Sequence, residues 1–142
     1  QRQLGTVMDI YPTVLSVTGV QPPSGHTLDG TDLKTQIEGK QDTGRKEQFL
    51  MHFPHKHRSS YFTSYRDGDW KIIYHYRPND NPAKTQYELF NLVTDPYENE
   101  NLAGTKPKVL KRMMNSLAAS LQAESALYPV DANGSEMHPE VP

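Results

Sequence analysis

The sequence predicts an α+β fold, in which a small antiparallel sheet of about four strands packs against one long C-terminal helix. Two observations support this fold class: four short runs rich in β-branched and aromatic residues lie between positions 48 and 92, and a single apolar pattern of helical period follows at 107–125. Hydrophobic residues make up 35% of the 142 residues and the mean hydropathy is -0.78, which predicts a thin core.

A short helix is predicted first, over residues 6–19. Asp9 is a candidate cap for its first turn, and Gly19 suits a left-handed stop. Residues 21–44 are polar and rich in glycine and proline, which predicts a loop with one helical turn at 32–37 and a domain boundary at its end. The predicted helix carries an apolar face made of Ile10, Val14, Leu15 and Val17.

The pattern then changes to that of strands. Runs at 48–53, 60–66, 70–76 and 86–92 have strand composition. Asp67-Gly68 separates two aromatic runs and predicts a tight hairpin. The aromatic side chains of the third run fit either a sugar-stacking platform or the core of the sheet, and we favour the core; they are Trp70, Tyr74 and Tyr76.

The predicted long helix spans 107–125 and opens on Pro107, which is favourable at a first helical position. Apolar residues recur along it at helical spacing. The tail at 128–142 contains glycine and proline, and we expect it to lie along the surface or to be disordered.

Charge and composition exclude several classes of protein. Fifteen basic and 17 acidic residues give a net charge of -2, which disfavours binding to nucleic acid through phosphate neutralisation. The absence of cysteine excludes disulfides, thiolate metal sites and a cysteine nucleophile. No apolar run approaches the roughly 18 residues of a membrane span.

One polar segment stands out as a candidate site. It runs from His52 to Arg58 and contains three imidazoles. Three interpretations remain open: a solvated loop in which Pro54 ends the strand pairing, a contact for a sulfate, phosphate or carboxylate, or a metal site formed by the histidines. Metal is the weakest of the three, because no Asp or Glu lies nearby to complete a site.

Other chemically suggestive residues have simple structural explanations. The aspartates Asp9, Asp29, Asp32 and Asp95 fit a cap or turns, and they are too scattered for a paired-carboxylate site. No stretch fits a nucleophile elbow or a phosphate loop. The residues by themselves therefore indicate a fold and one candidate segment, but no reaction.

Six short sequence segments, taken together and in their order along the chain, are more specific than any one of them. They are DIYPTVLSVTGV (9–20), LDGTDL (28–33), FLMHFPH (49–55), SYRDGDWKIIYHY (64–76), YELFNLVTDPYENENLA (87–103) and a helix that ends before Tyr128-Pro129. This succession resembles the C-terminal region of the formylglycine-dependent (type I, arylsulfatase-like) sulfatases of the alkaline phosphatase superfamily. The resemblance covers 7–129, and the His-Phe-Pro-His phrase is most similar to sulfatases of glycan-degrading bacteria.

The resemblance implies a periplasmic or secreted enzyme that hydrolyses sulfate esters of carbohydrates. A large α/β domain would hold the formylglycine and a calcium ion, and a smaller subdomain would pack beside the active site. We therefore expect 1–44 to be the C-terminal edge of the large domain, 45–129 the C-terminal subdomain and 130–142 a tail. The exposed face of the first helix would contact the missing domain or a second copy of the chain.

The departures from the family pattern limit what can be transferred. The modification motif, which begins Cys- or Ser-x-Pro-x-Arg, occurs nowhere in this sequence. We therefore assign no catalytic residue, no metal ligand and no cofactor to this chain, and expect it to be inactive alone. The candidate substrate-binding residues are His52, His55, His57 and Arg58. Two alternatives stay open: a related phosphonate or phosphate ester hydrolase, and a non-catalytic carbohydrate-binding or interaction module.

Overall fold

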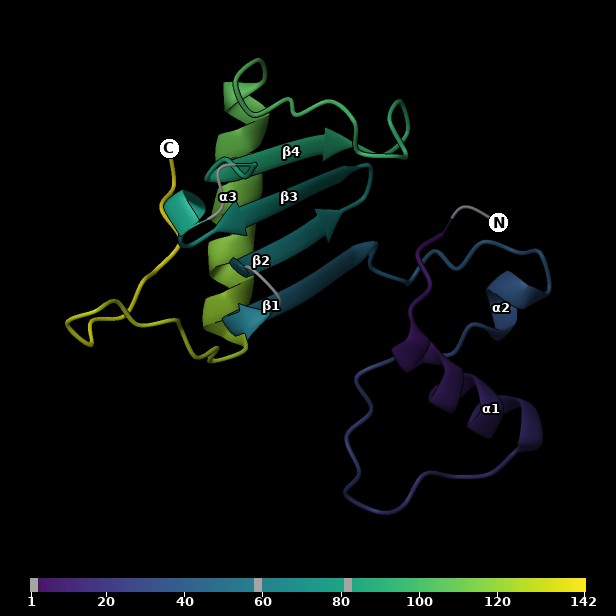
Figure 1. Ribbon diagram of the computed structural model, residues 1–142. Helices are drawn as coiled ribbons and strands as arrows, with labels where there is room; N and C mark the ends of the chain where they lie inside the picture. Colours follow the sequence, from purple (N-terminus) through teal and green to yellow (C-terminus); the bar gives the residue numbers. More distant parts are fainter. Residues whose placement is uncertain (1–2, 58–59, 81–82) are drawn as a thin grey trace. The chain divides into compact units, whose positions relative to one another are not determined.

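The computed structural model describes residues 3–57, 60–80 and 83–142 of the chain. The chain divides into two compact units, Gln1–Glu47 and Gln48–Pro142. Each unit is described by itself below, with the element labels of Figure 1.

The first unit contains a 3-10 helix, η1 (Val7–Asp9), which continues directly into α1 (Ile10–Thr18). Gly19 ends α1 with a φ of 70°, as the sequence predicts. A single turn, α2 (Lys34–Ile37), interrupts the loop that follows.

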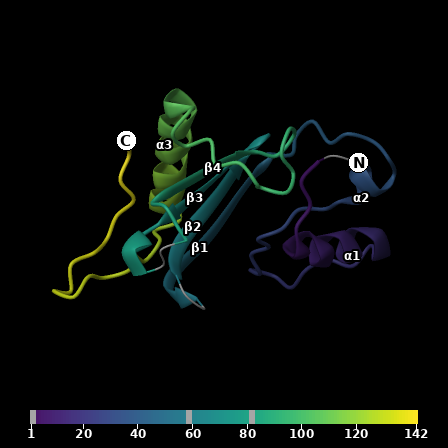
Figure 2. The ribbon, with the colours of Figure 1, turned by 45° about the horizontal axis from the view of Figure 1, so that its top comes forward.

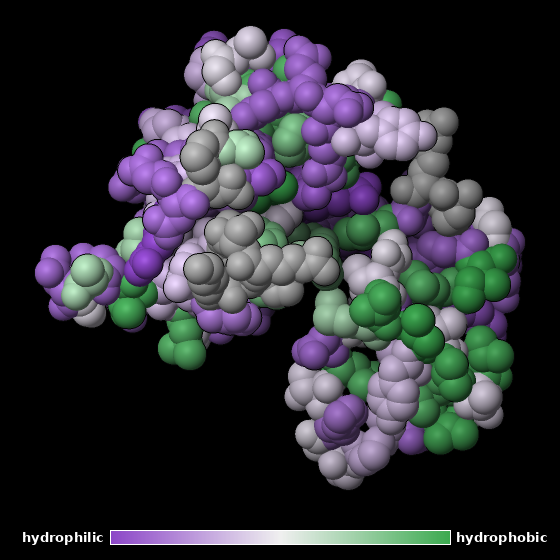
Figure 3. Space-filling view, in the orientation of Figure 1, coloured by the Kyte–Doolittle hydropathy of each residue, from purple (hydrophilic) through white to green (hydrophobic). Residues whose placement is uncertain are grey.

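The apolar face of the first helix lacks a cover, which confirms the exposed patch expected from its sequence. Val7 is 82% exposed and Val17 64%. Ile10 and Val14 are exposed as well, and Figure 3 shows the hydrophobic side chains gathered over this helix. Contiguous apolar surface of this kind marks an interaction site.

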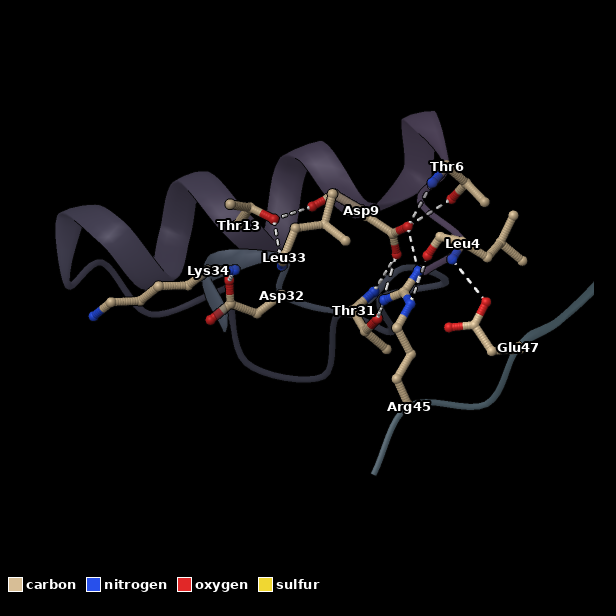
Figure 4. Close-up of polar contacts among 10 residues, drawn as sticks. All are labelled: Leu4, Thr6, Asp9, Thr13, Thr31, Asp32, Leu33, Lys34, Arg45 and Glu47. Atoms are coloured by element: carbon tan, nitrogen blue, oxygen red, sulfur yellow. Dashed lines mark hydrogen bonds and ion pairs between the residues drawn. The ribbon is translucent and has the colours of Figure 1, made fainter. Parts of the chain in front are cut away.

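Asp9 caps the start of the first helix, as the sequence predicts, through a capping box with Thr6 in η1. Asp9 also occupies the N-cap position of α1, but its side chain makes no capping hydrogen bond to that helix. The carboxylate is buried and accepts hydrogen bonds from the backbone N–H groups of Thr6 and Thr31, both at 2.7 Å. It also forms an ion pair with Arg45, Nη2 to Oδ2 at 2.7 Å, as Figure 4 shows. The carboxylate therefore closes the capping box at the start of η1 and also joins this helix to Thr31 and Arg45.

Gly30 makes the closest backbone approach in this unit. A Cβ atom built at Gly30 would lie 2.1 Å from the carbonyl oxygen of Met8, so only glycine fits without moving the backbone. This approach brings the loop to the end of η1, where Thr31 donates to Asp9.

The second unit is a four-stranded antiparallel sheet with the strand order β1-β2-β3-β4. The strands are β1 (Gln48–His57), β2 (Ser60–Asp67), β3 (Trp70–His75) and β4 (Tyr87–Asn91). Gly68, with a φ of 57°, forms the predicted hairpin between β2 and β3. A short 3-10 turn, η2 (Pro78–Asp80), lies in the connection to β4.

The strand β1 is longer than predicted and continues beyond Pro54. The pairing with β2 runs in register as far as Phe53 opposite Phe62, and then shifts before it resumes at His57 opposite Ser60. Pro54 lacks an N–H group and therefore coincides with an irregularity in the pairing, but it does not end the strand.

The helix α3 (Pro107–Ala123) packs against one face of the sheet, which the two views in Figures 1 and 2 show from different directions. Leu50, Tyr65, Ile72 and Leu89 stand in register across the four strands and face this helix. Tyr74 and Tyr76 belong to the same core, which confirms the core interpretation of these aromatics. From the helix come Leu110, Met113, Met114, Leu117 and Leu121, all buried.

The C-terminal tail is held along the surface of this unit. Val130 forms an antiparallel bridge with Glu136, and the N–H of Met137 donates to the carbonyl of Pro129 at 2.8 Å. Further along, the carbonyl of Glu140 accepts a hydrogen bond from the hydroxyl of Tyr87. The first of the two predicted possibilities, a tail lying on the surface, is therefore correct.

Candidate functional site

The strand geometry separates the histidines of the candidate segment. Side chains alternate between the two faces of a strand, and His52 lies on the face that carries α3, opposite Thr63 of β2. Its ring is in edge contact with the rings of Tyr76 and Tyr128. His52 is thus part of the packing between the sheet and the segment that follows α3.

Both ring nitrogens of His52 are engaged within the chain. Nε2 lies 2.7 Å from the carbonyl oxygen of Leu127, which can only accept, so Nε2 carries the hydrogen. Nδ1 then accepts from the hydroxyl of Thr63 at 2.7 Å, and this hydroxyl in turn accepts from Tyr76 at 2.9 Å. Burial raises the pKa of Tyr76 to about 12 despite its bond to Thr63, which keeps the phenol a donor at neutral pH.

His55 lies apart from this network and is exposed. Its ring is in edge contact with Phe53, at 5.9 Å between centroids. Phe53 stands on the sheet face opposite α3, where it meets Phe62, and Phe62 meets His75. These four side chains, His55, Phe53, Phe62 and His75, form a row of rings, and we refer to them as the ring row. The side chain of His57 and all of Arg58 lie outside the described residues.

A buried polar cluster closes the other end of the ring row. His75 is only 4% exposed, and its Nε2 donates to Glu88 at 3.0 Å. Lys84 reaches the same carboxylate, with Nζ 3.1 Å from Oε1. One carboxylate thus holds an imidazole and an ammonium group, which fixes the orientation of the His75 ring.

The other ring nitrogen of His75, Nδ1, is buried and has no hydrogen-bond partner among the described residues. Sequence analysis missed His75 and Glu88 because their contact is a diagonal one across β3 and β4. It depends on the pairing of Ile73 with Glu88, which no local pattern reveals.

The described residues contain neither a metal-binding cluster of side chains nor a membrane-spanning helix. No group of three or more His, Cys, Asp or Glu among them is arranged to hold a metal ion. None of the helices in the described part of the chain is long and apolar enough to cross a membrane. The calcium ion that the family resemblance implies therefore finds no such group of side chains among the described residues.

Comparison with known proteins gives consistent matches. The profile of the family described as N-sulphoglucosamine sulphohydrolase, C-terminal, matches residues 1–126. An uncharacterised sulfatase of Schizosaccharomyces pombe is 32% identical over 120 residues, which are 77% of this chain and 20% of the relative. Mouse steryl-sulfatase is 25% identical over 143 residues, 85% of this chain and 22% of its own. The chain spans about a fifth of the length of these curated relatives.

Solved structures agree. A protein in complex with its substrate D-glucosamine-2-N,6-O-disulfate is 26% identical, with a TM-score of 0.60 over 82% of this chain and 24% of its own. A 2-O GAG sulfatase, 17% identical, shares the fold with a TM-score of 0.61 over 94% of this chain and 31% of its own. Both matches cover most of this chain and a minor part of the other. By sequence and by fold, the chain belongs to the family of N-sulphoglucosamine sulphohydrolase C-terminal regions, and is thus the C-terminal region of a sulfatase.

Proposed function

We propose that this chain serves a sulfatase that acts on sulfated carbohydrate, and that it contributes to the fold and to the substrate pocket, not to the chemistry at sulfur. The observation that carries the proposal is the family match over residues 1–126. The solved relative that holds a disulfated glucosamine supports the substrate class. In this proposal the formylglycine and the calcium ion are held by the rest of the full-length enzyme, which we take to be exported to the periplasm or beyond the cell.

The proposal predicts no turnover of an aryl sulfate by the 142-residue chain alone, and turnover by the full-length protein. The chain lacks cysteine and offers no metal-binding cluster within its described residues. A full-length protein that hydrolysed a phosphonate or phosphate ester faster than the matching sulfate ester would contradict the substrate class. Turnover by the isolated chain would contradict the division of labour.

We propose that the exposed His55 contacts the substrate, with His57 and Arg58 next to it in the sequence, and that His52 positions the strand from which they extend. Two observations support this division. His55 is exposed at one end of the ring row, whereas both nitrogens of His52 are used inside the chain. An exposed imidazole and a neighbouring guanidinium suit the anionic groups of a sulfated sugar.

Kinetics of the full-length enzyme test this assignment. We expect His55→Ala to raise KM for a sulfated monosaccharide by about tenfold with little change in kcat, because it removes binding that substrate and transition state share. We expect His52→Phe to lower the unfolding midpoint instead, with a smaller effect on KM. A His55→Ala enzyme with unchanged KM, or with a loss confined to kcat, would contradict a substrate contact at this position.

We propose that the exposed face of α1 packs against the catalytic domain of the full-length enzyme. The face is apolar, and the relatives are about four times as long as this chain. Val14→Lys and Val17→Lys in the full-length protein should then lower its unfolding midpoint, whereas the same changes in the isolated chain should not. Dimerisation of the isolated chain that these changes abolish, with an unaltered full-length protein, would instead identify a second copy as the occupant.

A further inference from the structure

We propose that the second unit carries a separate binding site for an unsulfated pyranose, between the C-terminal end of α3 and the tail. A cavity of about 400 Å³ lies there, which is within the size range of small-ligand sites. All its lining residues are described and belong to the second unit; they are Ala118, Leu121, Gln122, Ser125, Ala126, Tyr128, His138 and Pro139. This inference goes beyond the proposed function and does not depend on it.

The cavity is built by specific contacts, not by a loose loop. The bond from His52 to the carbonyl of Leu127 fixes the backbone beside Tyr128, and the ring of His52 lies against its ring. The bridge between Val130 and Glu136 folds the tail back. As a result His138 is brought onto Tyr128, with 4.1 Å between ring centroids. One wall of the cavity is therefore a preorganised pair of rings.

Two polar side chains also line the cavity. They are Gln122 and Ser125, both partly open to solvent, and no hydrogen bond joins either side chain to another described residue. An amide and a hydroxyl can each donate and accept, as adjacent hydroxyls of a sugar ring require. Aromatic rings together with a few polar groups are the usual composition of a small-ligand site, and the apolar face of a pyranose suits the rings.

The backbone at Ser125 supports a role for its hydroxyl. Ser125 adopts a φ of 50°, just beyond the end of α3, in a conformation where glycine is the favoured residue. Serine at this position keeps a side chain on the cavity wall, although this backbone conformation is less favourable for serine than for glycine. Non-glycine residues held in this region are often associated with function.

The charges around the cavity select against a sulfated ring. Residues 113–142 contain Glu124, Asp131, Glu136 and Glu140, and no lysine or arginine. The imidazole of His138, the remaining group that can become cationic in this stretch, is already paired with Glu136 at 3.2 Å. Arg77 reaches the tail at the carbonyl of Val130, but no lysine or arginine lines the cavity itself, so a sulfate group in it would lack a direct cationic partner.

Titration of the 142-residue chain by NMR tests the site, with N-acetylglucosamine and glucosamine 6-sulfate as the two probes. We expect N-acetylglucosamine to shift the backbone amide signals of Gln122, Ser125 and Ala126, with millimolar affinity, and the sulfated sugar to bind at these amides more weakly. No saturable shift with N-acetylglucosamine would overturn the proposal. Tighter binding of the sulfated sugar at the same amides would overturn the assignment of an unsulfated ring.

Two variants separate binding from folding. Ser125→Gly removes the hydroxyl and relaxes the backbone, so we expect an equal or higher unfolding midpoint and an affinity weakened threefold to tenfold. Gln122→Ala, on the exposed side of α3, should weaken binding by a similar factor. Gln21→Ala, an exposed glutamine in the first unit, is the matched control and should leave affinity unchanged. Unchanged affinity in both cavity variants would refute the site.

Discussion

The ion pair between Asp9 and Arg45 gives the most quantitative prediction. The Asp9 side chain is buried, and burial by itself would raise the pKa of its carboxyl. The N–H groups of Thr31 and Thr6 and the guanidinium of Arg45 outweigh that effect and lower the pKa from 3.8 to about 2. This difference corresponds to about 2 kcal/mol of stabilisation at neutral pH.

The direction of the pH dependence is set by whether the folded or the unfolded chain binds the proton on Asp9 more tightly. Because the pKa is lower in the folded chain, the stabilisation is complete above about pH 4 and is lost as the pH falls towards about 2. Asp9→Asn removes the charge at every pH and leaves Arg45 buried without its counter-charge. We therefore expect this variant to destabilise the first unit by about 2–3 kcal/mol at pH 7.

Hydrogen exchange at the Thr31 amide reports on this unit directly, because that amide donates to Asp9. We expect Asp9→Asn to reduce its protection by about 30-fold at pH 7, and Asp29→Asn, a matched change at an exposed aspartate, to leave it unchanged. Equal protection in the two variants at pH 7 would refute the reasoning, and so would a wild-type stability that does not fall between about pH 4 and 2.

The remaining predictions concern backbone packing at two glycines and the two histidines of β1, His52 and His55. Gly30→Ala should lower the free energy of unfolding of the first unit by more than about 3 kcal/mol in urea, because its Cβ would collide with the Met8 carbonyl. Gly104→Ala is the control: its Cβ would meet open space, so the free energy of unfolding should change by less than about 0.5 kcal/mol. His52→Phe should lower the free energy of unfolding of the second unit by about 2 kcal/mol in urea, because two hydrogen bonds are lost. His55→Ala should leave the free energy of unfolding unchanged. Equal losses of stability in the two variants would contradict the separation of these histidines onto different faces of the sheet.

Local patterns were sufficient to predict the four strands, the hairpin at Gly68 and the long helix, because each rests on spacing or turn chemistry within a few residues. Local patterns could not predict which side chains contact each other across neighbouring strands. His52 and His55 look equivalent in the sequence. The alternation of side chains along β1 places His52 on the face that carries α3 and His55 on the opposite face, in the ring row. Likewise, the sequence identifies Asp9 as a cap, but its further contacts with Thr31 and Arg45 form only when these distant segments fold back onto it.

Which histidine contacts a ligand depends on surroundings that the sequence does not display. The contact between His75 and Glu88 needs the register of β3 with β4, and the fixed ring of His52 needs the segment after α3. Both partners lie more than ten residues away along the chain. The substrate contacts of His55, His57 and Arg58 stay predictions until the full-length enzyme is measured.

The strand order of the second unit has a consequence for how the chain folds. Every neighbour in the sheet is also the next strand in sequence, so no crossover connection has to close before the sheet is complete. Sheets of this kind have short loops to close, which favours rapid folding. We expect this unit to reach its native state on its own as it leaves the ribosome, whether or not the ion pair of Asp9 and Arg45 has formed. A unit that folds by itself in this way keeps its own core whatever the conformation of the first unit.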